Sequence, residues 1–248
     1  MIFPVDFLTI SILTLLYSVA LFIEQIALIS NIAGKIQSKL SQGLSFQHAT
    51  YALSRAPIPI ILVILSYLIE TNISLRDFVL ICFIMCLFAT FGLLLSLKFI
   101  NPVIIFYQRV IIFHESNTLP RSTYLAIFSK ASNDSLIEPK LDFSYKNLNF
   151  RKTFFSCIAF FFLGTAFLFS FSFANYFIEF RLTISQLTNF LQGFAVMILS
   201  FYINPMFSRS IDQNNSEYWM HNFYSIYFGR VLALITATIL FGLVLQMM

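Results

Sequence analysis

Three charged side chains lie inside apolar stretches of this sequence that are long enough to cross a bilayer. They are Glu24, Arg55 and Arg230. Hydrocarbon disfavours ionised groups so strongly that a charge kept there is a candidate functional residue. One carboxylate and two guanidinium groups leave a net positive charge, and a planar guanidinium binds phosphate oxygens two at a time. These residues predict an anion-binding site. The alternative is a structural Glu–Arg pair, which leaves the second arginine without a carboxylate.

The composition predicts an all-α integral membrane protein. Of the 248 residues, 58% are hydrophobic and 10% are charged, and the mean hydropathy is +0.83. A soluble domain averages about 25% charged residues, so this chain has too few for a water-facing surface. A glycine count of 7 argues against Gly-rich loops that cradle nucleotide phosphates. The net charge of +4 is interpreted as a property of the loops, not as a nucleic-acid surface.

Six mostly apolar windows of about 20 residues or more predict six transmembrane helices in a single transmembrane domain. The predicted spans are 7–30, 45–69, 78–99, 153–178, 183–206 and 222–246. A long loop, 100–152, joins the third span to the fourth. Its apolar start, Val103–Phe113, either extends the third helix or lies along the membrane interface. Its polar part, around Ser132–Asn149, predicts a solvated loop.

The basic residues predict the orientation of the spans. Of the 15 Lys and Arg residues, two lie inside the spans, two lie on the side of the termini, and eleven lie on the opposite side. Loops rich in Lys and Arg remain in the cytoplasm. We therefore expect both termini outside and the long loop in the cytoplasm. At about 1.5 Å per residue, Glu24, Arg55 and Arg230 then fall in the cytoplasmic half of the bilayer.

Helical periodicity indicates the inward faces of the first and sixth spans. Small and polar residues recur there at three- and four-residue steps, which lets helices approach closely. They are Thr14, Tyr17, Ala20, Glu24, Ala27 and Asn31 on the first span, and Tyr227, Arg230, Ala233 and Ala237 on the sixth.

The fourth span is rich in Phe and has no charge between Lys152 and Glu179, which predicts a lipid-facing scaffold.

Two prolines, Pro57 and Pro59, follow Arg55 closely. Because proline cannot donate to the carbonyl four residues earlier, the helix should break here, beside a buried charge. We expect either a hinge or a static kink.

The fifth span carries a polar face in its outer half. Arg181, Ser185, Thr188 and Gln192 share that face, and Gln186 is nearby. With Ser54, these residues predict a polar path; the alternative is that they form hydrogen bonds between helices.

No metal or cofactor site is predicted. Cys82 and Cys86 lie one turn apart without a His or carboxylate beside them, which favours inert packing.

Two stretches of the chain resemble the Amj family, the alternate lipid II flippases of bacterial inner membranes. The first stretch, 23–55, contains Glu24, Ala33–Gly34, Ser45 and Ser54–Arg55 at the family's spacings. The second stretch, 181–205, begins with RLTISQL and is followed by Asp212 and Gly229–Arg230. The chain departs from the family pattern at Asn31, at Ala56–Ile58, at Asn204 and in the last helix.

The resemblance implies a flippase that carries lipid II from the inner to the outer leaflet of the bacterial cytoplasmic membrane. Lipid II is an undecaprenyl-pyrophosphate-linked disaccharide pentapeptide. Arg55 and Arg230 would bind the pyrophosphate, and Glu24 would be their charge partner. The sugar hydroxyls would form hydrogen bonds with Ser185, Gln186 and Gln192. Besides lipid II, the expected partners are membrane lipids, with no nucleic acid, nucleotide or cofactor.

Two other classes of function are open from the sequence. A polyprenyl-phosphate-processing enzyme would need a nucleophile or a general base with metal or arginine support. His48, His114 and His221 have no carboxylate at ligand spacing. A non-transporting scaffold of a cell-wall complex would depend on its surface loops more than on Arg55 or Arg230.

Overall fold

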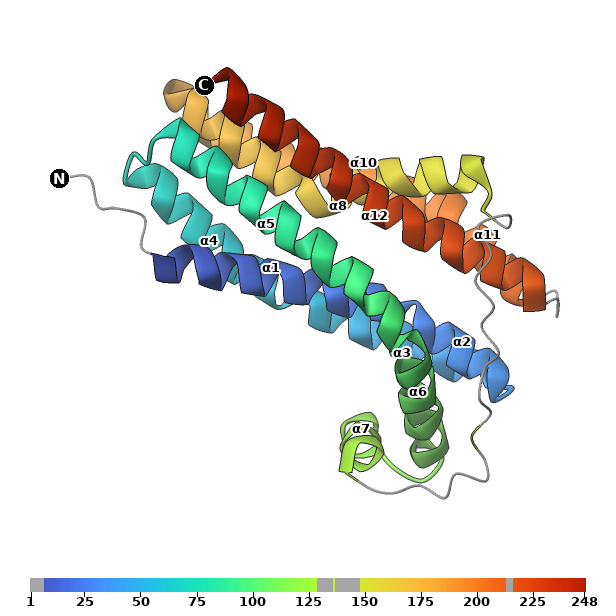
Figure 1. Cartoon of the computed structure of the whole chain (residues 1–248). Helices are drawn as coiled ribbons and strands as arrows, with labels where there is room; N and C mark the ends of the chain where they lie inside the picture. The colour runs from blue at the N-terminus through green and yellow to red at the C-terminus, as the bar shows by residue number, and fades with distance from the viewer. Residues whose placement is uncertain (1–6, 129–135, 137–147, 213–215) are drawn as a thin grey trace. The chain divides into compact units, whose positions relative to one another are not determined.

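The computed structural model describes residues 7–128, 136, 148–212 and 216–248, and its regular elements in these ranges are helices (Figure 1). Six helical stretches there are long and apolar enough to cross a membrane. They are Phe7–Ile36, Leu40–Glu70, Leu75–His114, Phe150–Tyr176, Ile178–Arg209 and Met220–Met247. These stretches confirm the predicted six-span, all-α membrane protein. The side of the membrane that each end faces stays a prediction.

Four of the six stretches are interrupted helices. The first contains α1 (Phe7–Ala27) and α2 (Ile29–Ile36), and the second contains α3 (Leu40–Arg55) and α4 (Pro57–Glu70). The third contains α5 (Leu75–Ser96), a 3₁₀ turn (Leu97–Phe99) and α6 (Ile100–His114). The fifth contains a 3₁₀ turn (Ile178–Phe180), α9 (Arg181–Ser185), α10 (Leu187–Ile198), a π turn (Leu199–Ile203) and α11 (Asn204–Asp212). By contrast, α8 (Phe150–Tyr176) and α12 (Ser216–Met247) are continuous.

Packing divides the chain into two compact units. The larger unit comprises Met1–Leu21, Ala56–Leu94 and Ser144–Met248. The smaller unit comprises Phe22–Arg55 and Leu95–Phe143. The chain passes from one unit to the other within α1, between α3 and α4, and near the end of α5. The prediction of a single transmembrane domain stays a prediction.

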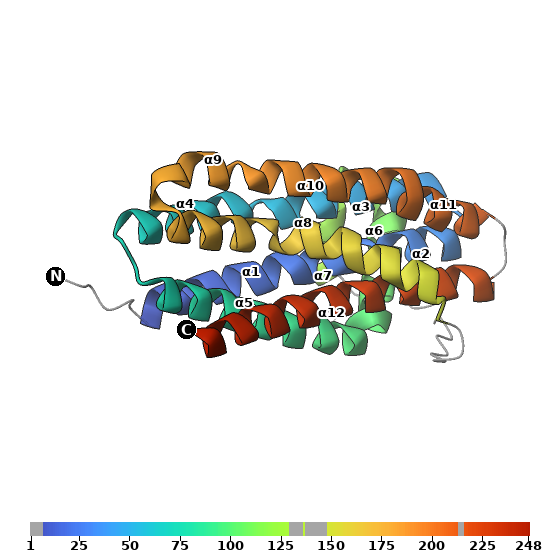
Figure 2. The same cartoon turned by 90° about the horizontal axis from the view of Figure 1, so that it is seen from above.

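The helix α8 is the central element of the larger unit. It packs against α12, α10, α9 and α4, and Figure 2 shows it running between α10 on one side and α12 on the other. Its buried side chains include Ser156, Ala159, Thr165 and Phe167. The prediction that the fourth span is a lipid-facing scaffold is therefore wrong. The small residues between the phenylalanines let neighbouring helices approach, and several of the phenylalanines fill the protein interior.

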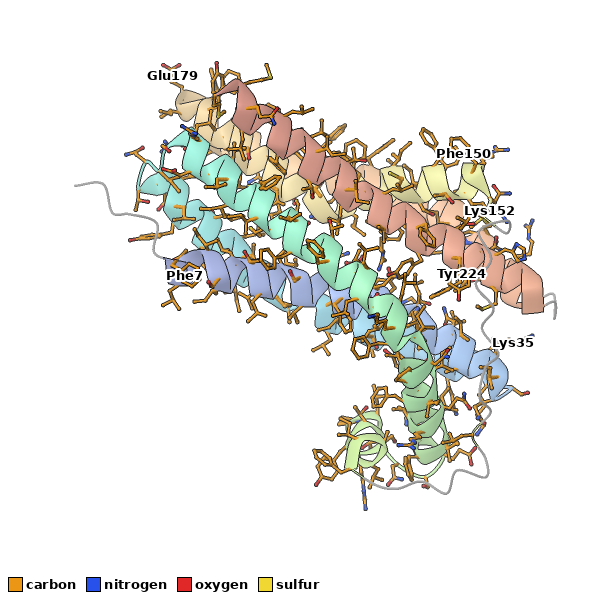
Figure 3. The ribbon with its side chains drawn as sticks, viewed as in Figure 1. Phe7, Lys35, Phe150, Lys152, Glu179 and Tyr224 are labelled. Carbon is orange, nitrogen blue, oxygen red and sulfur yellow. The ribbon has the colours of Figure 1, made fainter. Side chains whose placement is uncertain are left out.

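The helices α8 and α12 approach each other closely at Gly229. A Cβ atom at this position would lie 2.7 Å from the Thr153 carbonyl oxygen and 2.9 Å from the Cys157 backbone nitrogen. Polar contacts also join the start of α8 to the second and third turns of α12. The Asn149 N–H donates to Ser225 Oγ over 3.1 Å, and Lys152 Nζ donates to Asn222 Oδ1. Figure 3 shows Lys152 and Tyr224 on this end of the two helices.

The smaller unit is built on a hairpin of α2 and α3. Ser38, in the turn, has a left-handed backbone with φ of 56°. The hairpin is tight because a Cβ atom on Gly34 would lie 2.8 Å from the Gly43 Cα. Ser30 Oγ donates to the Gly43 carbonyl oxygen over 2.9 Å. Glycine is needed at both positions because the helix backbones touch.

The first part of the predicted long loop, 100–152, contains two helices. Val103–Phe113 lies within α6, which follows the third span through one 3₁₀ turn and packs against α2. A second helix, α7 (Leu119–Phe128), follows and packs against α6. Of the two alternatives for Val103–Phe113, the extension of the third helix is confirmed, because the third membrane-crossing stretch runs from Leu75 to His114. The expectation of a loop is wrong for 119–128. The solvated part predicted around Ser132–Asn149 lies mostly outside the described residues.

Candidate ion-pair site

Glu24 and Arg55 form an ion pair within the smaller unit. Arg55 Nη2 lies 3.7 Å from Glu24 Oε2. The Glu24 side chain is 7% exposed, whereas the Arg55 side chain is 42% exposed. A charge-assisted hydrogen bond is about 2.7–2.9 Å long, so the attraction in this pair is mainly Coulombic. An anion that reached Arg55 at hydrogen-bonding distance would hold this guanidinium more closely than Glu24 does.

The local sequence explains why the two side chains lie at the ends of helices. Glu24 lies in the last turn of α1, and Arg55 is the last residue of α3. The helix ends at Arg55 because Pro57, the first residue of α4, has no N–H for the carbonyl of residue 53. An arginine at a helix C-terminus also interacts favourably with the helix dipole. The break at Ala56 thus places a half-exposed guanidinium at the end of a helix.

The same break coincides with the predicted hinge. Pro57 and Pro59 lie in the first turn of α4, and the boundary between the two compact units falls between Arg55 and Ala56. The backbone of Ala56 itself is helical, with φ of −59° and ψ of −37°. The structure therefore shows an interrupted helix without a strained residue at the predicted position. Whether the chain bends there stays a prediction.

Arg230 lies in the larger unit and has a different environment. It is 4% exposed, and its Cζ lies 3.9 Å from the centroid of the Phe160 ring on α8. A desolvated cation over an aromatic face is stabilised by about 2 kcal/mol or more. Gly229 sets this geometry because its lack of a side chain brings α12 against α8. The Phe-rich sequence of the fourth span predicted a lipid-facing helix, so this contact of Arg230 with Phe160 was not expected.

The inward faces predicted for the first and sixth spans are confirmed. All six residues predicted to face inward on the first span are buried, as are all four on the sixth. Two tyrosines in these sets donate to main-chain carbonyls of neighbouring helices. Tyr17 Oη donates to Gly164 O over 3.1 Å, and Tyr227 Oη donates to Leu93 O. Burying a phenol in an apolar interior requires such a partner.

Four residues of the predicted polar path form hydrogen bonds, and three of their partners are near in sequence. Ser54 is buried and donates to Tyr51 O over 2.8 Å. The remaining contacts are from Arg181 Nη2 to Asn72 Oδ1 (3.0 Å), from Ser185 Oγ to Leu182 O (2.8 Å), and from Asn189 Nδ2 to Gln186 Oε1 (2.9 Å). Gln192 is half-buried and Gln186 is exposed. Ser54 lies beside Arg55 in the smaller unit, and the other four residues belong to the larger unit.

A set of polar contacts that sequence reasoning did not predict links the helices of the smaller unit. Asn31 Nδ2 donates to Gln47 Oε1, which joins α2 to α3. Gln37 Nε2 donates to Gln108 Oε1 over 2.8 Å, and the hydroxyls of Thr50 and Tyr107 lie 2.9 Å apart. Asn31 and Gln108 are almost fully buried. The sequence signal for this network was polar side chains in otherwise apolar helices, but their pairing is visible only in three dimensions.

Comparison of the chain with protein-family models, with curated proteins and with solved structures gave no match. The structure itself shows a multi-pass helical membrane protein. In its smaller unit, a buried carboxylate lies beside a half-exposed guanidinium. A second guanidinium is buried over a phenylalanine in its larger unit.

Proposed function

We propose that this protein is a lipid flippase of the Amj type, which moves lipid II from the inner to the outer leaflet of the bacterial cytoplasmic membrane. The observation that carries the proposal is the Glu24–Arg55 pair. Its carboxylate is buried and its guanidinium is 42% exposed, 3.7 Å away. A buried structural ion pair repays the cost of desolvation only when its hydrogen-bond geometry is excellent, and a separation of 3.7 Å does not provide such geometry. Arg55 instead retains exposed donors for an anion.

Arg55 is assigned to the pyrophosphate of the substrate. The pyrophosphate oxygens are stronger and more numerous acceptors than one carboxylate at 3.7 Å, and guanidinium groups bind phosphate in bidentate geometry. Glu24 neutralises Arg55 in the absence of substrate, and this limits the cost of a lone charge in the membrane. Substrate binding exchanges one anionic partner of Arg55 for another, and release restores the original pair.

Arg230 is assigned a second contact with the pyrophosphate, and this role requires a local rearrangement. Its guanidinium is 4% exposed and lies over Phe160, so it must leave this ring before an anion can reach it. The cation–π contact stabilises the charge while no substrate is present. The role assigned to Arg230 therefore predicts a step of the transport cycle in which its guanidinium leaves the Phe160 ring.

The polar side chains of the fifth span are assigned to the sugar and peptide portion of lipid II. Gln186 and Gln192 are the members whose amides are exposed or half-buried, and amides bind sugar hydroxyls as both donors and acceptors. The polyprenyl tail stays in lipid. A membrane potential that is negative inside favours outward movement of the anionic headgroup by about 2.3 kcal/mol per charge per 100 mV.

The test is translocation of fluorescent lipid II in proteoliposomes, with and without an imposed potential. We expect transport by the wild-type protein, loss of transport in Arg55→Ala and Arg230→Ala, and faster transport under a potential that is negative on the donor side. Arg76→Ala is the matched control, because Arg76 is an exposed arginine at the start of α5. Transport at wild-type rate by Arg55→Ala would overturn the assignment, and no transport by the wild-type protein would overturn the function.

A further inference from the structure

The short helix α7 lies outside the six stretches that can cross a membrane. It has 10 residues, Leu119–Phe128. At 1.5 Å per residue it is about 15 Å long, whereas the hydrocarbon core of a bilayer is about 30 Å thick. It therefore cannot span the membrane. A membrane-spanning position does not explain which of its side chains are exposed.

The two faces of α7 are reversed relative to those of a helix on a soluble protein. The buried face carries Ser122, which is 0% exposed, and Ala126, which is 3% exposed. The opposite face carries Tyr124, Ile127 and Phe128, which are 61%, 59% and 70% exposed. A surface helix in water shows the opposite arrangement, with its apolar stripe toward the core.

The exposed face of α7 is continuous and combines apolar side chains with one cation. At about 100° per residue, the exposed residues from Pro120 to Phe128 fall within an arc of about 120°. Tyr124 and Phe128 are one turn apart, with ring centroids 4.8 Å apart. Arg121 is exposed at the edge of the same arc. We define this surface as the α7 face: Pro120, Arg121, Tyr124, Ile127 and Phe128.

We propose that the α7 face lies in the interface of the membrane, with its apolar side chains below the headgroups and Arg121 bound to anionic lipid headgroups. Tyrosine and arginine suit this position because each has an apolar body and a polar end. Helices that bind the membrane surface combine an apolar face with basic residues in this way. The proposal is independent of lipid II transport.

The chain leading to α7 keeps this face within a short distance of the end of the third membrane-crossing stretch. The third membrane-crossing stretch ends at His114, and only Glu115–Thr118 separate it from α7. Four residues reach at most about 14 Å. Figure 1 shows α7 beside the end of α6, and the two helices pack against each other. The apolar segment Val103–Phe113, the other candidate for an interfacial helix, lies in α6 and buries Ile104, Tyr107 and Ile111 against the protein.

The experiment places an environment-sensitive fluorophore on single cysteines in the full-length protein, after the three native cysteines are replaced by alanine. The labelled positions are Tyr124→Cys and Phe128→Cys, and the matched control is Ser116→Cys in the exposed turn before α7. The protein is reconstituted in phosphatidylcholine vesicles with and without phosphatidylglycerol. Quenching is measured with lipids brominated on the acyl chain and with aqueous iodide.

We expect blue-shifted emission at positions 124 and 128, with quenching by brominated lipid and little quenching by iodide, and the reverse at 116. Phosphatidylglycerol should increase the shift, and Arg121→Gln should remove that increase. Iodide quenching at 124 and 128 equal to that at 116 would overturn the proposal. So would protection from both quenchers together with disulfide formation between two copies at position 124, because a second copy would then cover the face.

Discussion

Gly229 of α12 lies so close to Thr153 of α8 that a Cβ atom on the glycine would come within 2.7 Å of the threonine carbonyl oxygen. The two longest continuous helices of the larger unit therefore meet in backbone contact. This contact places Arg230, the next residue, over the Phe160 ring. The environment of one candidate functional charge thus depends on the absence of a side chain beside it.

Replacing this glycine by alanine should destabilise the larger unit. Overpacking a close contact costs about 1–3 kcal/mol, so we expect Gly229→Ala to lower the midpoint of thermal unfolding in detergent. Gly193→Ala is the control, because a Cβ atom at Gly193 has no neighbour within 4 Å. Alanine favours helix over glycine by about 1 kcal/mol, so the control should be neutral or stabilising. Equal midpoints for the two variants would contradict the close approach.

The buried Asn31–Gln47 contact should show strong coupling between its two members. Removing one partner leaves a buried amide unsatisfied, which costs about 1–3 kcal/mol. We therefore expect Asn31→Leu and Gln47→Leu each to lower the free energy of unfolding, and the double variant to lose less than the two single losses combined. Hydrogen bonds between membrane helices couple by about 0.6 kcal/mol on average and up to about 1.7 kcal/mol. Additive losses, measured by denaturation in micelles, would show that the contact adds no net stability.

Glu24→Gln should increase the affinity of the protein for the pyrophosphate headgroup. The change removes the competing negative charge but keeps the volume of the side chain. An ion pair with one half-exposed partner contributes about 1 kcal/mol, so the dissociation constant should fall about fivefold. The measurement is binding of lipid II to the detergent-purified protein by fluorescence anisotropy. Asp77→Asn, an exposed carboxylate at the start of α5, is the control and should bind as the wild type does.

Restoring the backbone donors at the break after Arg55 should slow transport if the break is a hinge. Pro57→Ala and Pro59→Ala together give α3 and α4 the N–H groups of a continuous helix. We expect the double variant to insert and fold normally but to translocate lipid II more slowly in proteoliposomes. Pro102→Ala, in the first turn of α6, is the matched control. Wild-type transport by the double variant would identify the break as a static kink.

Some of this architecture follows from local sequence alone. Six apolar windows determined six membrane-crossing stretches, because the bilayer fixes the length and hydrophobicity of a spanning helix. The three- and four-residue repeat from Thr14 to Asn31 determined an inward face, since small side chains let helices approach closely and polar side chains are disfavoured against lipid. The prolines after Arg55 determined where the second span is interrupted, because they lack a backbone donor.

The tertiary structure alone decided which side chains meet. The Phe-rich fourth span became the central helix because Gly229 and the small residues of α8 permit close packing, a property of helix pairs rather than of one segment. Packing of α3 set Arg55 beside Glu24, and packing of α12 set Arg230 over Phe160. In the same way, packing of α2 against α3 brought Asn31 within hydrogen-bonding distance of Gln47. Such pairings depend on contacts between helices distant in sequence, where steric fit and polar satisfaction must hold together, and no single helix encodes them.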